Sequence, residues 1–315
     1  MLARPCEASP WPTVVALWRL GRYRFLLGGF VLYGFGAALS RARGPIDWSA
    51  YLLGQGVITV TQLMTHYGND YFDRSSDRAN LTRTEWSGGS GVLQEGVLHP
   101  RVARDIALGF GAAALLLVAV IGATQRVAPG MTLLFGIALV LSWEYSAPPF
   151  RLHAHGLGPV TAAVVVGGLT PLAGYGMQAP SWSWTAVLSL APVLLAQFAL
   201  ILVLDFPDAE GDACAGKRTL VVLLGRERAV ELTVVAVLAV YGVLPVLVAA
   251  GVGGDLAYGV GATLPLAAWV VWTLLRGRWR SGGSAADLAW SGVLWFAAVS
   301  AESLLATAMN RIGRS

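Results

Sequence analysis

Apolar segments of about twenty residues recur along nearly the whole chain, and short polar stretches separate them. An α-helix needs about 20 apolar residues to cross the ~30 Å hydrocarbon core of a bilayer. The nine segments of this kind lie at 22–40, 48–68, 103–124, 130–146, 157–177, 184–204, 229–250, 257–275 and 286–308. The fourth is short for a complete crossing, but the pattern as a whole predicts a chain that passes through a membrane many times.

The composition excludes an ordinary water-soluble domain. Of the 315 residues, 56% are hydrophobic and only 13% are charged, whereas soluble domains carry about 25% charged residues. We expect an all-α fold, because only helices and closed barrels satisfy their backbone polar groups in lipid and because the apolar runs are continuous rather than alternating. The predicted architecture is a single domain, residues 1–315, built as a polytopic transmembrane bundle of about nine helices.

The distribution of basic residues predicts how the bundle is oriented. With the N-terminus inside, 17 of the 22 lysine and arginine residues fall in cytoplasmic segments, and the others are Arg41, Arg43, Arg126, Arg311 and Arg314. This asymmetry, with contact to anionic membrane lipid, accounts for the net charge of +4, so no nucleic-acid partner is expected. We therefore predict a multi-pass protein of the cell (inner or plasma) membrane with its N-terminus and active-site loops in the cytoplasm.

The N-terminal segment, residues 1–21, is predicted to be cytoplasmic and to contain a short interfacial helix at 13–20. It lacks the compact apolar region and the small-residue cleavage site of a signal peptide, so we expect no cleavable signal. Cys6 and Cys214 both fall on the predicted cytoplasmic side, where a disulfide is not expected.

The acidic residues are concentrated in two short windows. Seven of the 18 lie in 69–77 (NDYFDRSSD) and 205–212 (DFPDAEGD), each at the predicted cytoplasmic end of a span. In both windows three aspartates are spaced three and then four residues apart: Asp70, Asp73, Asp77, Asp205, Asp208 and Asp212. On a helix this spacing places all three carboxylates on one face. Pro207 and Gly211 predict that the second helix bends or frays there.

Three like charges on one helical stripe repel one another, so each window requires a positive group nearby. Carboxylate oxygens are preferred ligands of hard cations, and Mg²⁺ is typically held by one or two carboxylates together with phosphate oxygens and water. Two facing clusters therefore predict a site for two or more Mg²⁺ ions with a diphosphate between them. Helix capping or solvation would explain one such aspartate, but not two clusters with matching spacing.

Two other places in the sequence supply groups suited to a diphosphate. Lys217 is the only lysine in the chain; together with Arg218 it follows the second acidic window, and both side chains suit phosphate binding. Tyr145 and Arg151 flank the paired prolines that end the fourth span, and we predict that they lie near the phosphates.

The remaining polar features are less specific. The glycine-rich stretch 80–98 is predicted to be either a lid that closes over the site or a flexible connector. His66 lies one turn before Asp70 and is given no role. His153 and His155 are predicted to be solvated loop residues.

The two acidic windows resemble the signature motifs of the UbiA superfamily of intramembrane prenyltransferases. NDYFDRSSD fits N-D-x-x-D-x-x-x-D, DFPDAEGD fits D-x-x-D-x-x-x-D, and the downstream GKRT agrees as well. The resemblance covers the first seven spans well, whereas the last two match only as hydrophobic helices. It implies a UbiA-like bundle around a central cavity that opens sideways to the lipid.

Carried over by position, the resemblance implies the roles of individual residues. The metal-binding and catalytic set would be Asn69, Asp70, Asp73, Asp77, Asp205, Asp208 and Asp212. The substrate-binding set would be Asn69, Tyr145, Arg151, Lys217 and Arg218. The implied substrates are a polyprenyl diphosphate, whose tail the apolar spans would enclose, and an aromatic acceptor.

The stretch after the first window narrows the expected acceptor. TEWSGGSGVLQEGVL at 84–98 looks like the S-G-G-S-R-V-x-x-x-G pattern of 1,4-dihydroxy-2-naphthoate prenyltransferases of menaquinone synthesis, with Gly91 in place of the arginine. We therefore expect 1,4-dihydroxy-2-naphthoate. Prenyltransferases acting on 4-hydroxybenzoate, homogentisate or a secondary metabolite, and a terpene cyclase of the same superfamily, remain open alternatives.

A transporter built from repeats is the alternative from a different class. Transporters place their functional polar groups near the bilayer midplane. Here the acids gather at the ends of the predicted spans, which favours an enzyme.

Overall fold

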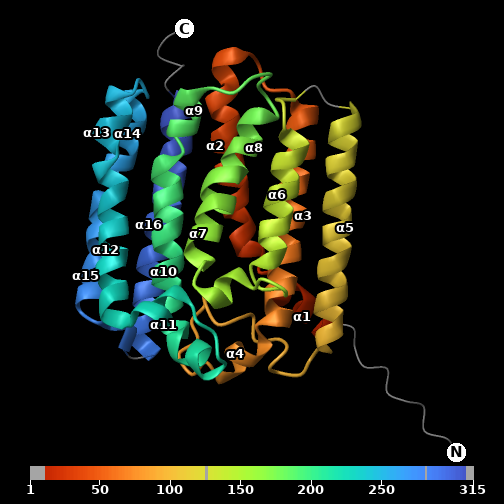
Figure 1. Cartoon of the computed structure of the whole chain (residues 1–315), viewed down its shortest axis with the longest axis vertical. Coiled ribbons are helices and arrows are strands. Elements are labelled where there is room, and N and C mark those ends of the chain that lie inside the picture. Colours follow the sequence, from red (N-terminus) through yellow and green to blue (C-terminus); the bar gives the residue numbers. More distant parts are fainter. Residues whose placement is uncertain (1–10, 125–126, 281, 310–315) are drawn as a thin grey trace, which may run out of the picture.

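The computed structural model describes residues 11–124, 127–280 and 282–309, and within these ranges its regular elements are all helices (Figure 1). The helices are α1 (Trp11–Gly21), α2 (Leu26–Ser40), α3 (Trp48–Phe72), α4 (Arg74–Ala79), α5 (Pro100–Thr124), α6 (Met131–Glu144), α7 (Gly158–Ala162), α8 (Thr170–Gly176), α9 (Trp184–Leu188), α10 (Ala191–Cys214), α11 (Leu220–Leu224), α12 (Arg226–Gly242), α13 (Leu244–Ala249), α14 (Gly254–Ala262), α15 (Leu264–Leu275) and α16 (Gly282–Met309). The π-helical stretch Ala163–Leu169 joins α7 to α8. Every predicted apolar segment is thus helical over most of its length. Cys6 lies outside the described residues, and Cys214 is exposed as a free thiol.

Six stretches of the described chain are long and apolar enough to cross a membrane, and α14 with α15, bent by 45°, makes a seventh if the pair is one span. The chain is therefore a multi-pass membrane protein. Two of the nine predicted spans, α3 and α6, are not among these stretches, and the physical reason differs between them. The 14 residues of α6 extend only about 21 Å. α3 is long enough, but its cavity lining includes the polar residues Thr61, Gln62, Thr65 and His66.

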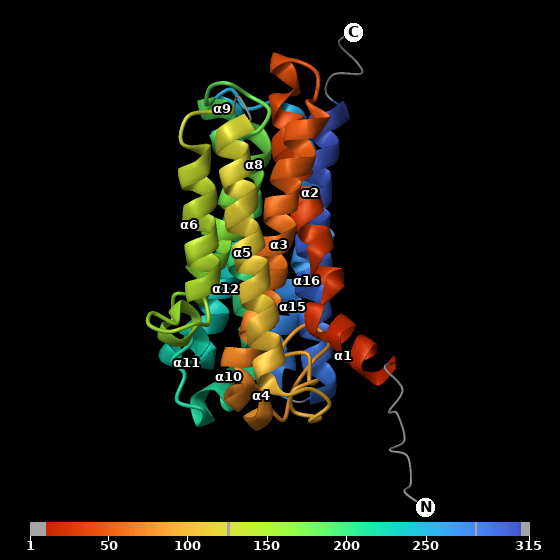
Figure 2. The same cartoon turned by 90° about the vertical axis from the view of Figure 1, so that its right-hand side faces the viewer.

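The outer surface of the bundle matches a lipid environment. Leu115 and Leu116 on α5 are 60% and 67% exposed, and other helices likewise turn large apolar side chains outward. A water-soluble monomer rarely exposes so much contiguous apolar surface. Over the predicted interfacial segment, α1 is a helix that turns away from α2 (Figure 2). Arg22 makes this turn in the left-handed region, at φ 44°.

Small residues allow α2 and α8 to pack closely. A Cβ atom added at Gly36 would lie 1.7 Å from the carbonyl oxygen of Pro171, and one added at Gly174 would lie 2.0 Å from that of Tyr33. Close contact through small residues is how membrane helices gain packing energy, because lipid supplies no hydrophobic driving force between them.

We expect Gly36→Ala to lower the stability of the purified protein by about 1–3 kcal/mol, because the added methyl group meets a backbone atom that can move only with its helix. Thermal unfolding in detergent is the measurement. Gly136→Ala is the matched control, since a Cβ atom there meets nothing within 4 Å. Equal stability of the two variants would contradict the close α2–α8 packing.

Candidate active site

A cavity of about 670 Å³ lies inside the bundle, lined mainly by residues of α2, α3, α6, α10 and α16 and of the 80–98 segment. Its walls are mostly apolar, as Val31, Val57, Phe135 and Leu200 illustrate, while one end is rich in charge. The lining at that end includes Asn69, Asp73, Asp77, Asp205, Asp208, Asp212, Arg22, His153 and Lys217. The cavity can therefore hold a molecule with a long apolar part and a polar head that reaches the acidic end together with bound cations.

The first acidic window spans a break between two helices. Asp70 is on the last turn of α3, Asp73 is the residue at which α3 ends and α4 begins, and Asp77 is on α4. The prediction that all three lie on one helix is thus wrong. The break turns the chain at Asp73, and the cavity lining still includes both Asp73 and Asp77.

Asp70 is 2% exposed and is fully engaged. The Arg22 guanidinium donates to its Oδ1 atom at 2.6 Å, and the Ser90 backbone N–H lies 3.1 Å from Oδ2, which also accepts from the Ser90 hydroxyl. Asp70 thereby ties the end of α3 to the α1–α2 turn and to the glycine-rich segment.

The second acidic window lies entirely on α10. The helix continues through Pro207 to Cys214, so the predicted fraying is absent and the three aspartates do share one helix. The Asp208 carboxylate accepts from the Asn80 amide at 2.6 Å and from the Gly88 backbone N–H at 3.0 Å. The 80–98 segment is therefore attached to both acidic windows, through Ser90 on one side and Asn80 and Gly88 on the other.

Lys217 joins the two windows. Its ammonium group lies 2.9 Å from Asp73 Oδ1 and 3.3 Å from Asp212 Oδ1, and the side chain is only 6% exposed. A Schellman turn places it there: Lys217 N–H donates to the carbonyl of Asp212 at 2.9 Å, and Gly216, at φ 76°, supplies the left-handed residue that the turn requires.

The charges in this region shift one another's pKa values. Burial would raise the pKa of Asp73, but the positive charges of Lys217 and His153 hold it below its usual value. Burial would lower the pKa of Lys217, but Asp73 and Asp212 hold it above its usual value. No cation of the described residues lies at contact distance from Asp77, and burial, with the charge of Asp73, raises its pKa to about 8. Additional positive charge, such as a bound cation, would therefore stabilise the ionised carboxylates at the acidic end of the cavity.

The donor atoms suit Mg²⁺ held jointly by protein and substrate. Within the described part of the chain, no three histidine, cysteine, aspartate or glutamate side chains are grouped closely enough to hold a metal ion by themselves. The Oδ2 atoms of Asp205 and Asp212 are nevertheless buried without a hydrogen-bond partner. Mg²⁺ commonly takes one or two carboxylates and completes its octahedron with phosphate oxygens and water, so the residues present fit this ion.

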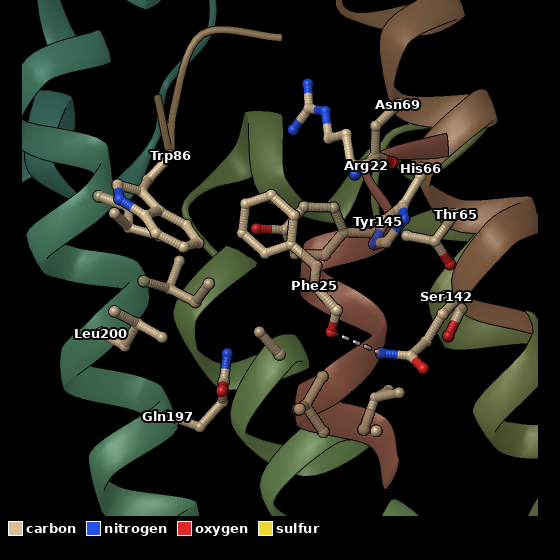
Figure 3. Close-up of a pocket in the computed structure, with 18 of the residues that line it drawn as sticks. Arg22, Phe25, Thr65, His66, Asn69, Trp86, Ser142, Tyr145, Gln197 and Leu200 are labelled. Carbon is tan, nitrogen blue, oxygen red and sulfur yellow. Dashed lines mark hydrogen bonds between the residues drawn. The ribbon is translucent and has the colours of Figure 1, made fainter. Parts of the chain in front are cut away.

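The other predicted site residues divide into two groups. Asn69 and Tyr145 line the cavity, and Figure 3 shows both directed into it. The Tyr145 ring stacks on His153 at 5.0 Å between ring centroids. Arg151 and Arg218 do not line the cavity, and the Arg218 side chain is exposed.

Several residues that the sequence did not single out belong to the site. His153, predicted to be a solvated loop residue, instead lies with its Nε2 atom 3.1 Å from Asp205, and His155 is exposed as predicted. Burial would lower the pKa of His153, but the Asp205 carboxylate raises it above its usual value. One indication in the sequence pointed to His153 as a site residue: it lies in the loop that follows Tyr145. Arg22, predicted only as one of the cytoplasmic basic residues, also lines the cavity.

The structure shows what surrounds Gly91, the residue that stands where the 84–98 motif has an arginine. Gly91 adopts φ +80°, and a Cβ atom at this position would lie 1.9 Å from Nη1 of Arg83. The guanidinium of Arg83 therefore occupies the space that a side chain at position 91 would need. A guanidinium group thus lies close to position 91, although the motif's arginine is absent there.

The fold and the cavity together define a membrane-embedded helical protein whose mostly apolar cavity ends in a cluster of acidic and basic side chains. A model of the UbiA prenyltransferase family matches residues 29–301, and the chain belongs to this family. It is accordingly a prenyltransferase.

Two curated relatives are naphthoate-type enzymes. A 2-carboxy-1,4-naphthoquinone phytyltransferase of Synechocystis sp. is 31% identical over 108 residues, which are 34% of this chain and 35% of that protein. A 1,4-dihydroxy-2-naphthoate octaprenyltransferase of Bacillus subtilis is 24% identical over 216 residues, which are 69% of this chain and 68% of that protein. The match thus spans about a third of the first relative and about two thirds of the second.

Solved structures share the fold at low sequence identity. A UbiA homologue from Aeropyrum pernix superposes with a TM-score of 0.65 and 18% identity, covering 88% of this chain and 97% of that one. A UbiA homologue from Archaeoglobus fulgidus, bound to DMAPP and Mg²⁺, superposes with a TM-score of 0.64 and 17% identity. The match covers 93% of this chain and 99% of that one.

Proposed function

We propose that this protein transfers a prenyl group from a polyprenyl diphosphate to 1,4-dihydroxy-2-naphthoate, in a Mg²⁺-dependent reaction of menaquinone synthesis. The observation that carries the proposal is the meeting of two aspartate windows at one end of a mostly apolar cavity, where Lys217 bridges them. A diphosphate head fits that end, and an isoprenoid tail fits the apolar remainder. The two naphthoate-type relatives support the choice of acceptor.

The five aspartates that line the cavity, with Asn69, would hold two or more Mg²⁺ ions together with the diphosphate, while Asp70 is engaged by Arg22 and Ser90. Bound Mg²⁺ supplies the positive charge that neutralises the diphosphate as it leaves. Lys217 adds a buried ammonium group, Arg22 adds a guanidinium on the Asp70 side, and both act on the same leaving group. The predicted phosphate contacts of Arg151 and Arg218 are not needed for this proposal.

Two features of the chain favour attack by the acceptor over attack by water. The 80–98 segment is bonded across the acidic end through Asn80, Gly88 and Ser90, where it limits access of water. The Tyr145 ring lines the cavity and offers its face to the allylic cation that forms as the C–O bond breaks. The diphosphate leaves with the electron pair of the broken C–O bond, and an electron-rich ring carbon of the acceptor forms the new C–C bond. A base or the departing diphosphate then takes the proton from that ring carbon.

The membrane placement follows the charge pattern. We place the acidic end of the cavity at the cytoplasmic face, because the basic residues near it, including Arg19, Arg22 and Lys217, belong to the segments that the positive-inside rule assigns to the cytoplasm.

The test is an assay of the purified protein in lipid with geranylgeranyl diphosphate, Mg²⁺ and a panel of acceptors: 1,4-dihydroxy-2-naphthoate, 4-hydroxybenzoate, homogentisate and none. We expect a prenylated naphthalenoid product, read by mass spectrometry, that disappears with EDTA and returns with excess Mg²⁺. Product from another acceptor, or a cyclised hydrocarbon without one, would overturn the naphthoate assignment. Product formation unaffected by EDTA would contradict the metal requirement.

A further inference from the structure

The hydrogen bonding of His66 fixes the state of its ring. Its Nδ1 atom lies 2.8 Å from the carbonyl oxygen of Gly21, which is one of the last carbonyls of α1 and has no partner within that helix. A carbonyl oxygen can only accept, so Nδ1 carries the proton. In the neutral ring, Nε2 is then a hydrogen-bond acceptor.

The Nε2 atom of His66 is available to a ligand. The residue lines the cavity, and no group in the described ranges is bonded to Nε2. Figure 3 shows the ring on the α3 side of the cavity, beside Thr65 and Asn69. The hydroxyl of Thr65, by contrast, is already bonded to the carbonyl of Thr61 at 2.9 Å.

Aromatic rings lie next to the His66 ring. The Phe25 ring is 5.8 Å from His66 and 5.3 Å from Trp86, both edge-on, and Trp86 is in turn 4.9 Å from Trp290. All four residues line the cavity. Such a wall suits a flat aromatic molecule, which it would contact by stacking and edge-to-face packing.

The depth of His66 matches the place where the acceptor must lie. His66 and Asp70 are four residues apart on α3, so His66 lies about 6 Å deeper on the same helical face. A diphosphate held by the aspartates would place the first carbon of the prenyl chain just below them. The attacking ring carbon must come within about 3–3.5 Å of that carbon, which puts a ring substituent within reach of His66.

We propose that His66 Nε2, with the rings of Phe25 and Trp86, forms the acceptor subsite and accepts a hydrogen bond from a phenolic hydroxyl group of the acceptor. This inference rests on the proposed function and names the substrate group that the site recognises. A carboxylate would be repelled by the lone pair of Nε2, whereas a hydroxyl group is bound. Because the bond draws the hydroxyl proton toward Nε2, it increases the electron density of the ring that attacks.

The test compares binding of 4-hydroxy-2-naphthoate with that of 2-naphthoate, which lacks only the hydroxyl group, by titration calorimetry of the purified full chain. We expect the wild-type protein to prefer the hydroxylated ligand about tenfold. His66→Phe should bind the two ligands within about twofold of each other, and His66→Gln, which retains an acceptor oxygen, should recover part of the preference. Thr59→Val is the matched control on the same helix, since Thr59 does not line the cavity.

Two outcomes overturn the subsite: a wild-type protein without the preference, or His66→Phe with the full preference. Prenyl transfer measured on the same preparations separates this inference from the proposed function. If the preference depends on His66 but the wild-type protein transfers no prenyl group, the proposed function fails and His66 is left as part of a site that binds hydroxylated aromatic molecules. If the wild-type protein is active and His66→Phe has an unchanged KM for the acceptor, the subsite alone fails.

Discussion

Asp208→Asn is expected to reduce the rate of prenyl transfer by about 10³-fold or more, the scale seen when a group that stabilises transition-state charge is removed. The substitution removes a negative charge from the acidic end of the cavity but keeps the size of the side chain. It also keeps an oxygen that can accept from the Gly88 N–H, but the amide NH2 group then faces the Asn80 donor, so the hydrogen bond from Asn80 is lost. The initial rate of diphosphate release, measured at saturating Mg²⁺, is the readout, and the size-exclusion profile verifies folding.

Glu210→Gln is the matched control for Asp208→Asn. Glu210 is on the same helix two residues away, but its side chain is 70% exposed and pairs with Arg226 at 2.9 Å outside the cavity. An exposed pair of this kind contributes little, so we expect activity within about twofold of wild type. Full activity of purified Asp208→Asn would refute the role proposed for the second window.

Lys217→Met is expected to lower the stability of the metal-free protein by about 3–5 kcal/mol, the cost of removing one partner of a buried ion pair. Asp73 and Asp212 would be left facing each other without the ammonium group, although the volume of the side chain is nearly kept. Thermal unfolding in EDTA is the measurement. Added Mg²⁺ should recover part of the loss, because it supplies positive charge to the same carboxylates.

The neighbouring Arg218→Ala is the control for Lys217→Met. The Arg218 side chain is exposed, and the backbone N–H of Arg218 donates to the carbonyl of Ala154 at 2.9 Å. Because the substitution leaves this backbone hydrogen bond in place, we expect wild-type stability. Equal stability of both variants in EDTA would mean that Lys217 does not hold the two windows together.

The parts of the fold that follow from local pattern could be predicted from the sequence. Long apolar runs specify helices in lipid because no other conformation satisfies the backbone there, and all nine runs are helical over most of their length. The repeated spacing of the aspartates likewise identified both acidic windows. Both the apolar runs and the aspartate spacing involve residues that are close together in the chain, so they can be recognised without knowledge of the packing.

The partners of the aspartates could not be predicted, because they come from distant segments. Arg22 is 48 residues from Asp70, His153 is 52 from Asp205, and Asn80 is 128 from Asp208. Only the packing of the bundle brings these groups together. The break of the first window at Asp73 was missed for a related reason: the contacts that Asp73 makes at this turn, with Ser146 and Lys217, are also distant in sequence.

The central claim is that the two windows act as one site for a metal-bound diphosphate. Its most direct test is the binding of Mn²⁺, a paramagnetic substitute for Mg²⁺, followed by electron paramagnetic resonance with and without a non-reactive geranylgeranyl thiolodiphosphate. We predict tight Mn²⁺ binding only when the analogue is present, and loss of that binding in both Asp73→Asn and Asp208→Asn. Tight Mn²⁺ binding that is unaffected by either substitution would contradict the account.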